Sequence, residues 1–446
     1  EYVRDHKDQV LAELRDFLSI PSVSSNPSEH EEVKRATAWL ADRLNRVGMD
    51  RVEIVPTKGH AVVFAQSMAA GPSAPTVLIY GHYDVQSAAP LSDWDTDPYR
   101  PTVRGDDLFA RGASDNKGQI MACVAAVEAV LKSGDAPVNI KFVIEGEEEL
   151  GSPHFADFLK EHRSLLSGDL VLNADVGMLG PDLPTIFYGL RGMQAWKLRV
   201  LGPATDLHSG GFGGVVHNPI HALADLIAGL HDDEGRVTLD GFYDDVRPLT
   251  PQEREEMERT PRDDACYLRE SGVKELWGEP GFCAAEREGS RPALDVVHVI
   301  GGSDKSAIPS EAMALITVRL VPDQNPAAIN ESFVRYLEQR LPSTVEWEVL
   351  DREGFTASLT DRDTKGVQSL ARAMEEVWGK PPVFCRSGGS IAAVGQLREI
   401  LGLDSVLTGF ALPDAHTHGP NEKLNLPTWE KGVEALVRFL YHMAEA

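Results

Sequence analysis

The sequence predicts an α/β fold, in which an open sheet is flanked by helices and a smaller α+β domain is inserted into the chain. Strand-like and helix-like segments alternate from the N-terminus to about Val176, and the pattern returns from about Asp361 to the C-terminus. Such alternation predicts a sheet with helices on both faces. Between these parts, segments that alternate apolar and polar residues are typical of a sheet with one solvated face. We therefore expect one domain built from residues 1–189 and 359–446, and a second domain at residues 190–358.

The first part of the chain begins with an amphipathic helix. Its apolar residues recur at helical spacing and are Val10, Leu11, Leu14, Phe17 and Leu18. Pro21 ends this helix, and a second helix is expected at about residues 31–47. Runs of apolar and β-branched residues predict strands at 61–66, 76–81, 139–145 and 169–175, with a helix at 116–134.

The inserted part has a different character. Alternating segments predict strands at 192–202 and 311–322, and helices are expected at 218–230 and 327–341. The charged, Pro-rich segment from Asp232 to Arg291 has no pattern that assigns it to helix or loop. A helix at 364–379 returns the chain to the α/β pattern.

Composition excludes some classes of partner. The 446 residues suggest two or three domains, and the net charge is −26. This charge argues against nucleic acid and against anionic membrane surfaces, both of which attract Lys and Arg. No apolar run is long enough to span a membrane, and the first 20 residues lack the core of a signal peptide. Glu1 stands first, so the sequence leaves open whether a leader was removed.

The cysteines indicate a reducing compartment. The chain has only four, which are far apart and form no C-x-x-C pair. They do not make the disulfide framework of a secreted protein, so we expect a cytoplasmic location.

Residues that can bind a metal stand at the ends of several predicted strands. They are His82 and Asp84 after one strand, Glu145 and Glu147–Glu149 after another, Asp175 after a third, and His416 and His418 after a fourth. Asp115 stands just before a predicted helix. In an open α/β sheet the ligand crevice lies at the carboxyl ends of the strands. We therefore expect these groups to converge on one edge of the sheet.

Each group taken alone has an ordinary structural explanation. A single His-x-Asp is usually a turn, an acidic run is usually a solvated loop, and Asp115 is a natural helix cap. Together, however, carboxylates crowded at one edge repel one another unless a cation neutralises them. Histidines and carboxylates are the ligands of zinc or a similar ion. The phosphate-binding patterns G-x-G-x-x-G and G-x-x-x-x-G-K-[ST] and the serine-hydrolase pattern G-x-S-x-G are absent.

The chain resembles a known family over most of its length. The motifs GHYDVQ, RGASDNKGQ, EGEEELGS, NAD, DLHSGGFGG, VRLVPDQNP, RSGGSI and HGPNEKLN occur in this order from about His82 to Lys423. They resemble the two-metal peptidases, a family that includes cytosolic nonspecific dipeptidase and carnosinase, glutamate carboxypeptidase, acetylornithine deacetylase and succinyl-diaminopimelate desuccinylase. DLHSG and GFYDDV are most similar to the dipeptidase branch. The resemblance implies a mixed sheet of the zinc-peptidase type and an inserted domain that serves as lid and dimer contact.

The resemblance also implies a metal site. His82 and Asp175 would hold one ion, Glu149 and His418 the other, and Asp115 would bridge the two. Asp84 would orient the imidazole of His82. Two divalent ions per chain are expected, with zinc first and manganese or cobalt as alternatives.

Further residues receive catalytic and substrate-binding roles from the same resemblance. Aligned on Leu150-Gly151-Ser152, Glu148 is the general base, which leaves Glu145 and Glu147 as loop residues. His208 would bind the developing oxyanion and Arg319 a substrate carboxylate. Gly388, Gly389 and Ser390 would donate hydrogen bonds to the same end of the substrate. Ser387 departs from the acid that often precedes this Gly-Gly-Ser, and His416 is either a loop residue or a substrate contact.

The implied enzyme is a metallopeptidase of the dipeptidase or carboxypeptidase type. It would cleave the amide bond next to a C-terminal carboxylate, through a bridging water activated by two metals and a glutamate base. The first alternative is an N-acyl amino acid deacylase or desuccinylase on the same site. A non-catalytic binding or scaffold protein is the alternative from another class. The resemblance further implies a homodimer in which His208 serves the partner's site.

Overall fold

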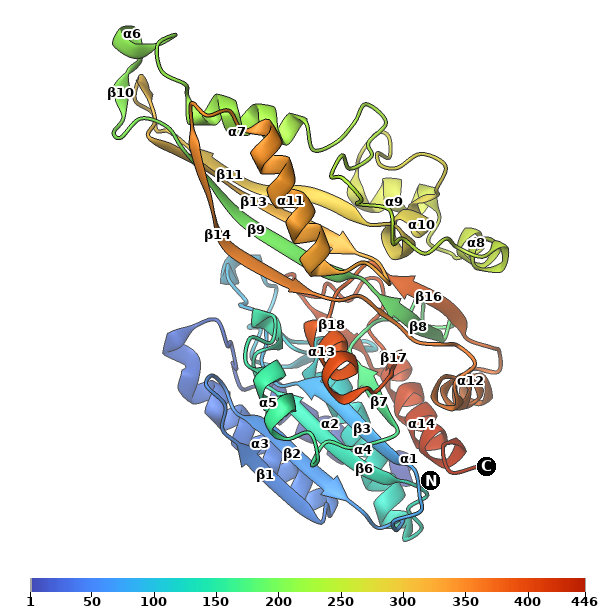
Figure 1. Cartoon of the computed structure of the whole chain (residues 1–446). Helices are drawn as coiled ribbons and strands as arrows, with labels where there is room; N and C mark the ends of the chain where they lie inside the picture. Colours follow the sequence, from blue (N-terminus) through green and yellow to red (C-terminus); the bar gives the residue numbers. More distant parts are fainter. Residues whose placement is uncertain (1, 446) are drawn as a thin grey trace. The chain divides into compact units, whose positions relative to one another are not determined.

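The computed structural model describes residues 2–445, and this chain divides into two compact units. Unit 1 contains the chain up to Tyr188, Thr360–Cys385, and the chain from Ile391 onward. Unit 2 contains Gly189–Leu359 together with Arg386–Ser390. Figure 1 traces the chain through both units.

Unit 1 is built on a mixed sheet. In spatial order its strands are β1 (Arg51–Val55), β2 (Val62–Ser67), β6 (Asn139–Glu145), β3 (Thr76–His82), β7 (Leu170–Ala174), β17 (Ser405–Thr408) and β8 (Thr185–Leu190), with β16 (Val383–Ser387) paired to β8. Strands β6, β3, β7 and β17 run parallel, whereas β1, β2 and β8 pair antiparallel to their neighbours. The prediction of a mixed sheet is therefore confirmed. The parallel strands direct their carboxyl ends to one edge.

Helices cover both faces of this sheet (Figure 1). One face packs against α2 (Lys7–Leu18), α3 (His30–Val47), α4 (Lys117–Ser133), α12 (Lys365–Trp378) and α14 (Leu426–His442). The other packs against α5 (Phe155–Glu161) and α13 (Ala392–Leu401). On β3, Val77 and Ile79 point to the first core, and Leu78 and Tyr80 point to the second. This period of two explains why the central strands are apolar on both sides.

A small antiparallel sheet completes unit 1. It consists of β4 (Thr102–Arg104), β5 (Asp107–Phe109) and β18 (Lys423–Asn425). Because β5 pairs with β18, the segment before α4 lies beside the segment before α14, although more than 300 residues separate Asp107 from Asn425 in its partner strand.

Unit 2 is an antiparallel sheet with helices on one face. Its strands are β11 (Ala293–Gly301), β13 (Glu311–Leu320), β9 (Gly192–Leu201) and β14 (Glu346–Phe355), in that order. Their inward residues pack against α7 (Pro219–Ala228) and α11 (Pro326–Arg340). Figure 1 shows these two helices beside the sheet. Trp196 is fully buried and stacks on Phe333 with ring centroids 3.9 Å apart. Shorter elements are β10 (Leu207–His208), α6 (Ser209–Phe212), β12 (Ala307–Ile308) and β15 (Ser358–Leu359).

The segment from Asp232 to Arg291 contains three short helices. They are α8 (Pro251–Glu258), α9 (Asp264–Ser271) and α10 (Ala284–Ser290). Thr250 and Glu253 form a capping box at the start of α8, and Asp263 caps α9. Met257 is the one buried residue of α8. Local caps rather than an apolar stripe therefore define these helices, which is why apolar periodicity did not reveal them.

Across residues 2–445, no helix combines the length and apolar character that a membrane crossing requires.

Candidate metal centre

The topology of unit 1 brings the predicted ligands to one edge of the sheet. His82 is the last residue of β3, and Asp175 directly follows β7. Glu148 and Glu149 lie in the turn after β6. The loop that follows β17 carries His418, and Asp115 comes two residues before α4.

Asp115 lies between the two histidines. Its Oδ1 is 3.0 Å from Nε2 of His82, and its Oδ2 is 2.9 Å from Nε2 of His418. Each carboxylate oxygen therefore faces a different imidazole, which is the arrangement that a carboxylate shared by two ions requires.

Two groups of possible ligands share Asp115. The first is His82, Asp115 and Asp175, and the second is Asp115, Glu149 and His418. Within each group the ligand atoms lie within 4.8 Å of one another. Imidazole nitrogens and carboxylate oxygens suit zinc and related divalent ions. The structure thus brings together all five side chains expected as ligands, while their role as ligands stays a prediction.

Asp84 is buried beneath the imidazole of His82. Nδ1 of His82 donates to the backbone carbonyl of Asp84 at 3.1 Å, and Oδ1 of Asp84 is 3.3 Å from the same nitrogen. The Asp84 carboxylate also accepts from the Ser24 hydroxyl at 2.7 Å and from the backbone N–H groups of Glu148 and Glu149. One carboxylate thereby fixes both the His82 ring and the turn that carries the two glutamates.

Glu148 lies beside the first ligand group without belonging to either group. Its Oε2 is 4.0 Å from Nε2 of His82. Burial raises the pKa of Glu148 well above its ordinary value; His82 opposes this rise, and the carboxylates of Asp175 and Asp115 add to it. A glutamate carboxylate is a common general base, so a position beside the ligand groups but outside both of them fits the predicted role.

Burial and charge shift the pKa values of the ligand residues in opposite directions. Burial lowers the pKa of His82, but the carboxylates around it outweigh burial and raise the pKa well above 6.5. Hydrogen bonds to Asp115 and Glu149 raise the pKa of His418 to about 10. Burial raises the pKa of Asp115, yet its bonds to the two histidines outweigh that effect and lower it. In the metal-free protein, protons on the histidines therefore offset the negative charge of the site.

Two uncharged side chains hold the ligands and were not identified from the sequence. The Asn116 amide donates to Asp175 and to the carbonyl of Ala174. The backbone and side-chain N–H groups of Gln86 each donate to Glu149 at 3.0 Å. Both residues stand inside recognisable motifs, but an amide carries no charge or metal-ligand signal that would single it out.

The expectation that Glu145 and Glu147 are loop residues is wrong for Glu145 and incomplete for Glu147. Glu145 is the buried last residue of β6 and accepts from the Tyr80 and Ser152 hydroxyls, both at 2.8 Å. Glu147 is also buried and lies 2.9 Å from Nδ1 of His154. Hydrogen bonding allows these carboxyl groups to be buried.

The remaining predicted residues lie in unit 2. His208 is exposed, and its Nδ1 accepts from the backbone N–H of Gly210 at 3.1 Å. Nη1 of Arg319 donates to the Ser390 hydroxyl at 2.8 Å, so the structure brings these two together.

Gly388 and Gly389 belong to the same short segment as Ser390. Their carbonyls accept from the side chain and backbone of Arg191, at 2.9 and 3.1 Å. The backbone N–H of Gly389 donates to the Ser387 hydroxyl at 3.0 Å. Its expected role as a donor to the substrate stays a prediction.

His416 is exposed in the loop of unit 1 that carries His418. Its carbonyl accepts from the backbone N–H of Gly419 at 2.8 Å and closes a turn. This contact accounts for a loop role, and the alternative role as a substrate contact stays a prediction.

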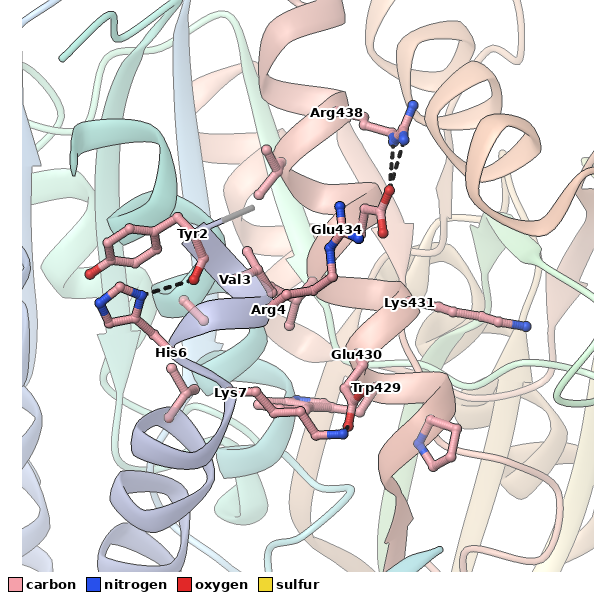
Figure 2. A pocket seen from close by; sticks show the side chains of 15 residues that line it. Tyr2, Val3, Arg4, His6, Lys7, Trp429, Glu430, Lys431, Glu434 and Arg438 are labelled. Carbon is pink, nitrogen blue, oxygen red and sulfur yellow. Dashed lines mark hydrogen bonds and ion pairs between the residues drawn. The ribbon is translucent and has the colours of Figure 1, made fainter. Parts of the chain in front are cut away.

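A separate pocket of about 570 Å³ in unit 1 is lined by α14 and by residues near the N-terminus (Figure 2). Lys7 and Glu430 form an ion pair of 2.6 Å there, and Arg438 pairs with Glu434 at 2.7 Å. None of the candidate metal ligands lines this pocket. Because it lacks these residues, this pocket is not a candidate for the reaction site, despite its size.

Comparison with known proteins identifies the family. The family model described as Peptidase family M20/M25/M40 matches residues 78–442. The chain belongs to this family. The resemblance stated from the motifs is confirmed, and the chain is a metal-dependent peptidase.

Relatives match the chain over its full length. It is 31% identical to Beta-Ala-His dipeptidase of Homo sapiens, over 100% of this chain and 92% of that protein. It is 27% identical to the Cys-Gly metallodipeptidase DUG1 of Saccharomyces cerevisiae, over 99% of this chain and 96% of that protein.

Solved structures share the fold. Human carnosine dipeptidase 1 superposes with a TM-score of 0.85 at 30% identity, covering 99% of this chain and 97% of that chain. The M20 family metallo-carboxypeptidase Sso-CP2 of Sulfolobus solfataricus gives a TM-score of 0.87 at 30% identity, covering 98% and 99%. The predicted fold class is confirmed by these likenesses.

We predict that the metal-free protein loses stability as pH rises from about 6.5 to about 10. Protonated His418 pairs with two carboxylates, and its pKa is raised from 6.5 to about 10. Its contribution is therefore fully present below the pKa of the unfolded chain and is lost as pH rises through the folded pKa. Urea unfolding in the presence of a chelator, at a series of pH values, measures this. The variant His418→Gln should show a shallower slope, and an unchanged slope would contradict the prediction.

Proposed function

We propose that this metallopeptidase hydrolyses dipeptides or short peptides at the amide bond next to a free C-terminal carboxylate. The observation that carries the proposal is Asp115, shared by two ligand groups, with Glu148 beside them. The similarity to Beta-Ala-His dipeptidase and to Cys-Gly metallodipeptidase supports dipeptides as substrates. These relatives do not favour the N-acyl amino acid deacylase alternative. A cytoplasmic location is part of the proposal, supported by four widely spaced cysteines.

Two divalent ions fit the donor set of the site. His82, Asp115 and Asp175 would hold one, and Asp115, Glu149 and His418 the other. Zinc suits these ligands best, and manganese or cobalt would be accepted by the same donors. When bound, such ions polarise the scissile carbonyl and make water a stronger nucleophile at neutral pH.

Glu148 is the proposed general base. It takes a proton from the attacking water and delivers it to the departing amine. Its place outside both ligand groups supports this division of labour with Glu149, which belongs to the second group. Asp84 holds the Glu148 turn in place by accepting its backbone N–H.

His208 is the proposed donor to the developing oxyanion. Because its Nδ1 accepts a hydrogen bond from Gly210, the neutral ring carries its proton on Nε2. An exposed Nε2–H is the donor that an oxyanion requires.

Arg319 is the proposed anchor of the substrate carboxylate. It lies on β13 and is half-buried, with Ser390 as its hydrogen-bond partner. The guanidinium keeps further N–H groups for a carboxylate, and the two-pronged geometry suits that ligand. The Ser390 hydroxyl, which is hydrogen-bonded to Arg319, would donate a second hydrogen bond to the same carboxylate.

A homodimer formed by unit 2 is also part of the proposal. Strand β11 lies at the edge of the four-stranded sheet, and its Val297, Val299 and Ile300 are each 50% or more exposed. An exposed apolar edge strand favours pairing with another strand, here from a second copy of the chain. The family resemblance implies that His208 would then serve the partner's site.

Substituting the two adjacent glutamates should separate base from ligand. Glu148→Ala should lower kcat by about 10²–10⁴-fold, since a general base is lost, and keep both ions. Glu149→Ala should lose one ion as well as activity. Metal analysis of purified protein measures this, with Glu147→Gln as a control that keeps both ions. If Glu148→Ala loses an ion and Glu149→Ala keeps both, the two roles are exchanged.

Arg319→Ala should weaken only substrates that have a free terminal carboxylate. The wild-type enzyme should prefer dipeptides to their C-terminal amides and to N-acetyl or N-succinyl amino acids. Loss of a charge-paired contact should cost free-acid dipeptides about 2 kcal/mol or more in kcat/KM. Arg199→Ala, which removes an arginine paired with Glu311 and Glu348 in the same sheet, is the control. Equal loss on amides and free acids would show that Arg319 is not the anchor.

Mixing two inactive variants should restore part of the activity if sites are shared across a dimer. One variant carries Glu148→Ala and the other His208→Ala. After subunit exchange, the mixed dimer holds one site with an intact base and an intact oxyanion donor. Activity of the mixture, measured alongside native mass spectrometry of the dimers, tests this.

The matched control mixes Glu148→Ala with Asp175→Asn. Both changes affect unit 1, so no mixed dimer has a complete site and activity should not return. If mass spectrometry shows mixed dimers of Glu148→Ala and His208→Ala but the mixture has no activity, the active sites are not shared between subunits.

A further inference from the structure

Arg111 and Glu422 form a buried ion pair next to the candidate metal centre. Their side chains are 2% and 0% exposed, and Nη1 of Arg111 donates to Oε2 of Glu422 at 2.7 Å. The two residues are 311 positions apart in the chain. Neither residue is a member of either ligand group.

Glu422 fixes the backbone that carries Asp115. Its Oε2 accepts from the N–H of Gly112 at 2.9 Å. Its Oε1 accepts from the N–H groups of Ser114 and Asp115 at 2.8 and 3.1 Å. One side chain thereby sets the course of the segment from Gly112 to Asp115.

Arg111 fixes the backbone that carries His418. Its Nη2 donates to the carbonyl of His418 at 3.0 Å and to that of Gly419 at 3.1 Å. The guanidinium also lies over the Trp94 ring, with its carbon 5.2 Å from the ring centroid. Arg111 thus holds the segment that contains His418, and Glu422 holds the segment that contains Asp115.

The His418 segment needs such support from its backbone. His416, His418 and Asn421 have φ angles of +54°, +63° and +58°, a region that residues with side chains rarely adopt. The His418 side chain is also 55% exposed, so packing does not hold it. In contrast, the His82 side chain is fully buried at the end of β3.

We propose that Arg111 and Glu422 are positioning residues for the ion that Asp115, Glu149 and His418 would hold. The inference rests on the proposed function, since it presumes two ions. The Nη2 of Arg111 itself reaches the carbonyls of Ser87, His418 and Gly419. The positions of His82 and Asp175 depend on strands β3 and β7. None of the side-chain hydrogen bonds of Arg111 described above goes to either strand.

The test measures Zn²⁺ affinity in chelator-treated protein by calorimetric titration. Arg111→Lys keeps a positive charge for Glu422 but loses the planar fork that reaches two carbonyls at once. It is combined with Asp175→Asn, which leaves the ion at His418, or with Glu149→Gln, which leaves the ion at His82. We expect Arg111→Lys to weaken the His418 ion by about 10- to 100-fold and to leave the His82 ion unchanged.

Arg43→Lys is the matched control, because Arg43 is another buried arginine of unit 1. It is 1% exposed and pairs with Glu13 and Glu128, with no contact to a candidate ligand. It should lower the urea midpoint and change neither affinity. Glu422→Gln is the second variant, since its amide oxygen can still accept from the Ser114 and Asp115 N–H groups while the ion pair is lost. It too should weaken the His418 ion, but this variant does not separate the two ions, because Asp115 belongs to both ligand groups.

The outcomes are distinguishable. Failure of the unsubstituted protein to bind two ions would overturn the proposed function itself. Two ions bound normally in Arg111→Lys and Glu422→Gln would overturn the positioning role alone. Equal weakening of both ions by Arg111→Lys, or unfolding of both variants, would show that the pair supports unit 1 as a whole and would also overturn the inference.

Discussion

Crowded carboxylates at one edge of a sheet are the constraint on which this site depends. Asp115, Glu148, Glu149 and Asp175 lie within reach of the same two imidazoles. Burial raises the pKa of Glu148, Glu149 and Asp175, because ionised carboxylates are poorly solvated there and repel one another. Protonation of a carboxylate or a nearby positive charge relieves this cost. Protonated histidines supply positive charge in the metal-free chain, and the divalent ions of the proposed function would supply it in the enzyme.

The protein holds these groups in two ways. His82 and Asp175 take their positions from β3 and β7, parallel strands inside a sheet covered on both faces. The turn with Glu148 and Glu149 and the loop with His418 are not part of the sheet. Buried charged side chains hold their backbones instead, Asp84 for the turn and Arg111 for the loop. For His418, whose side chain is 55% exposed, these bonds take the place of packing.

Unit 2 contributes a different chemistry. It carries no member of either ligand group, and its candidate groups are donors rather than ligands. The arginine on β13 and the hydroxyl of Ser390 suit a carboxylate, and the tautomer of His208 suits an oxyanion.

The sequence by itself determined the α/β class, the insertion and the five ligand candidates. Strand periodicity predicts the fold class, and parallel strands that end at one edge bring a larger set of His, Asp and Glu residues together. The resemblance of the motifs to a known family, rather than their spacing, selects the five from that set. Only the tertiary structure decided which oxygen of Asp115 faces which histidine, and that Asn116, Gln86, Arg111 and Glu422 support the ligands. It also decided that Glu145 is buried under hydrogen bonds. These contacts join residues up to 311 positions apart, and a local pattern cannot encode which distant partner a polar side chain will meet.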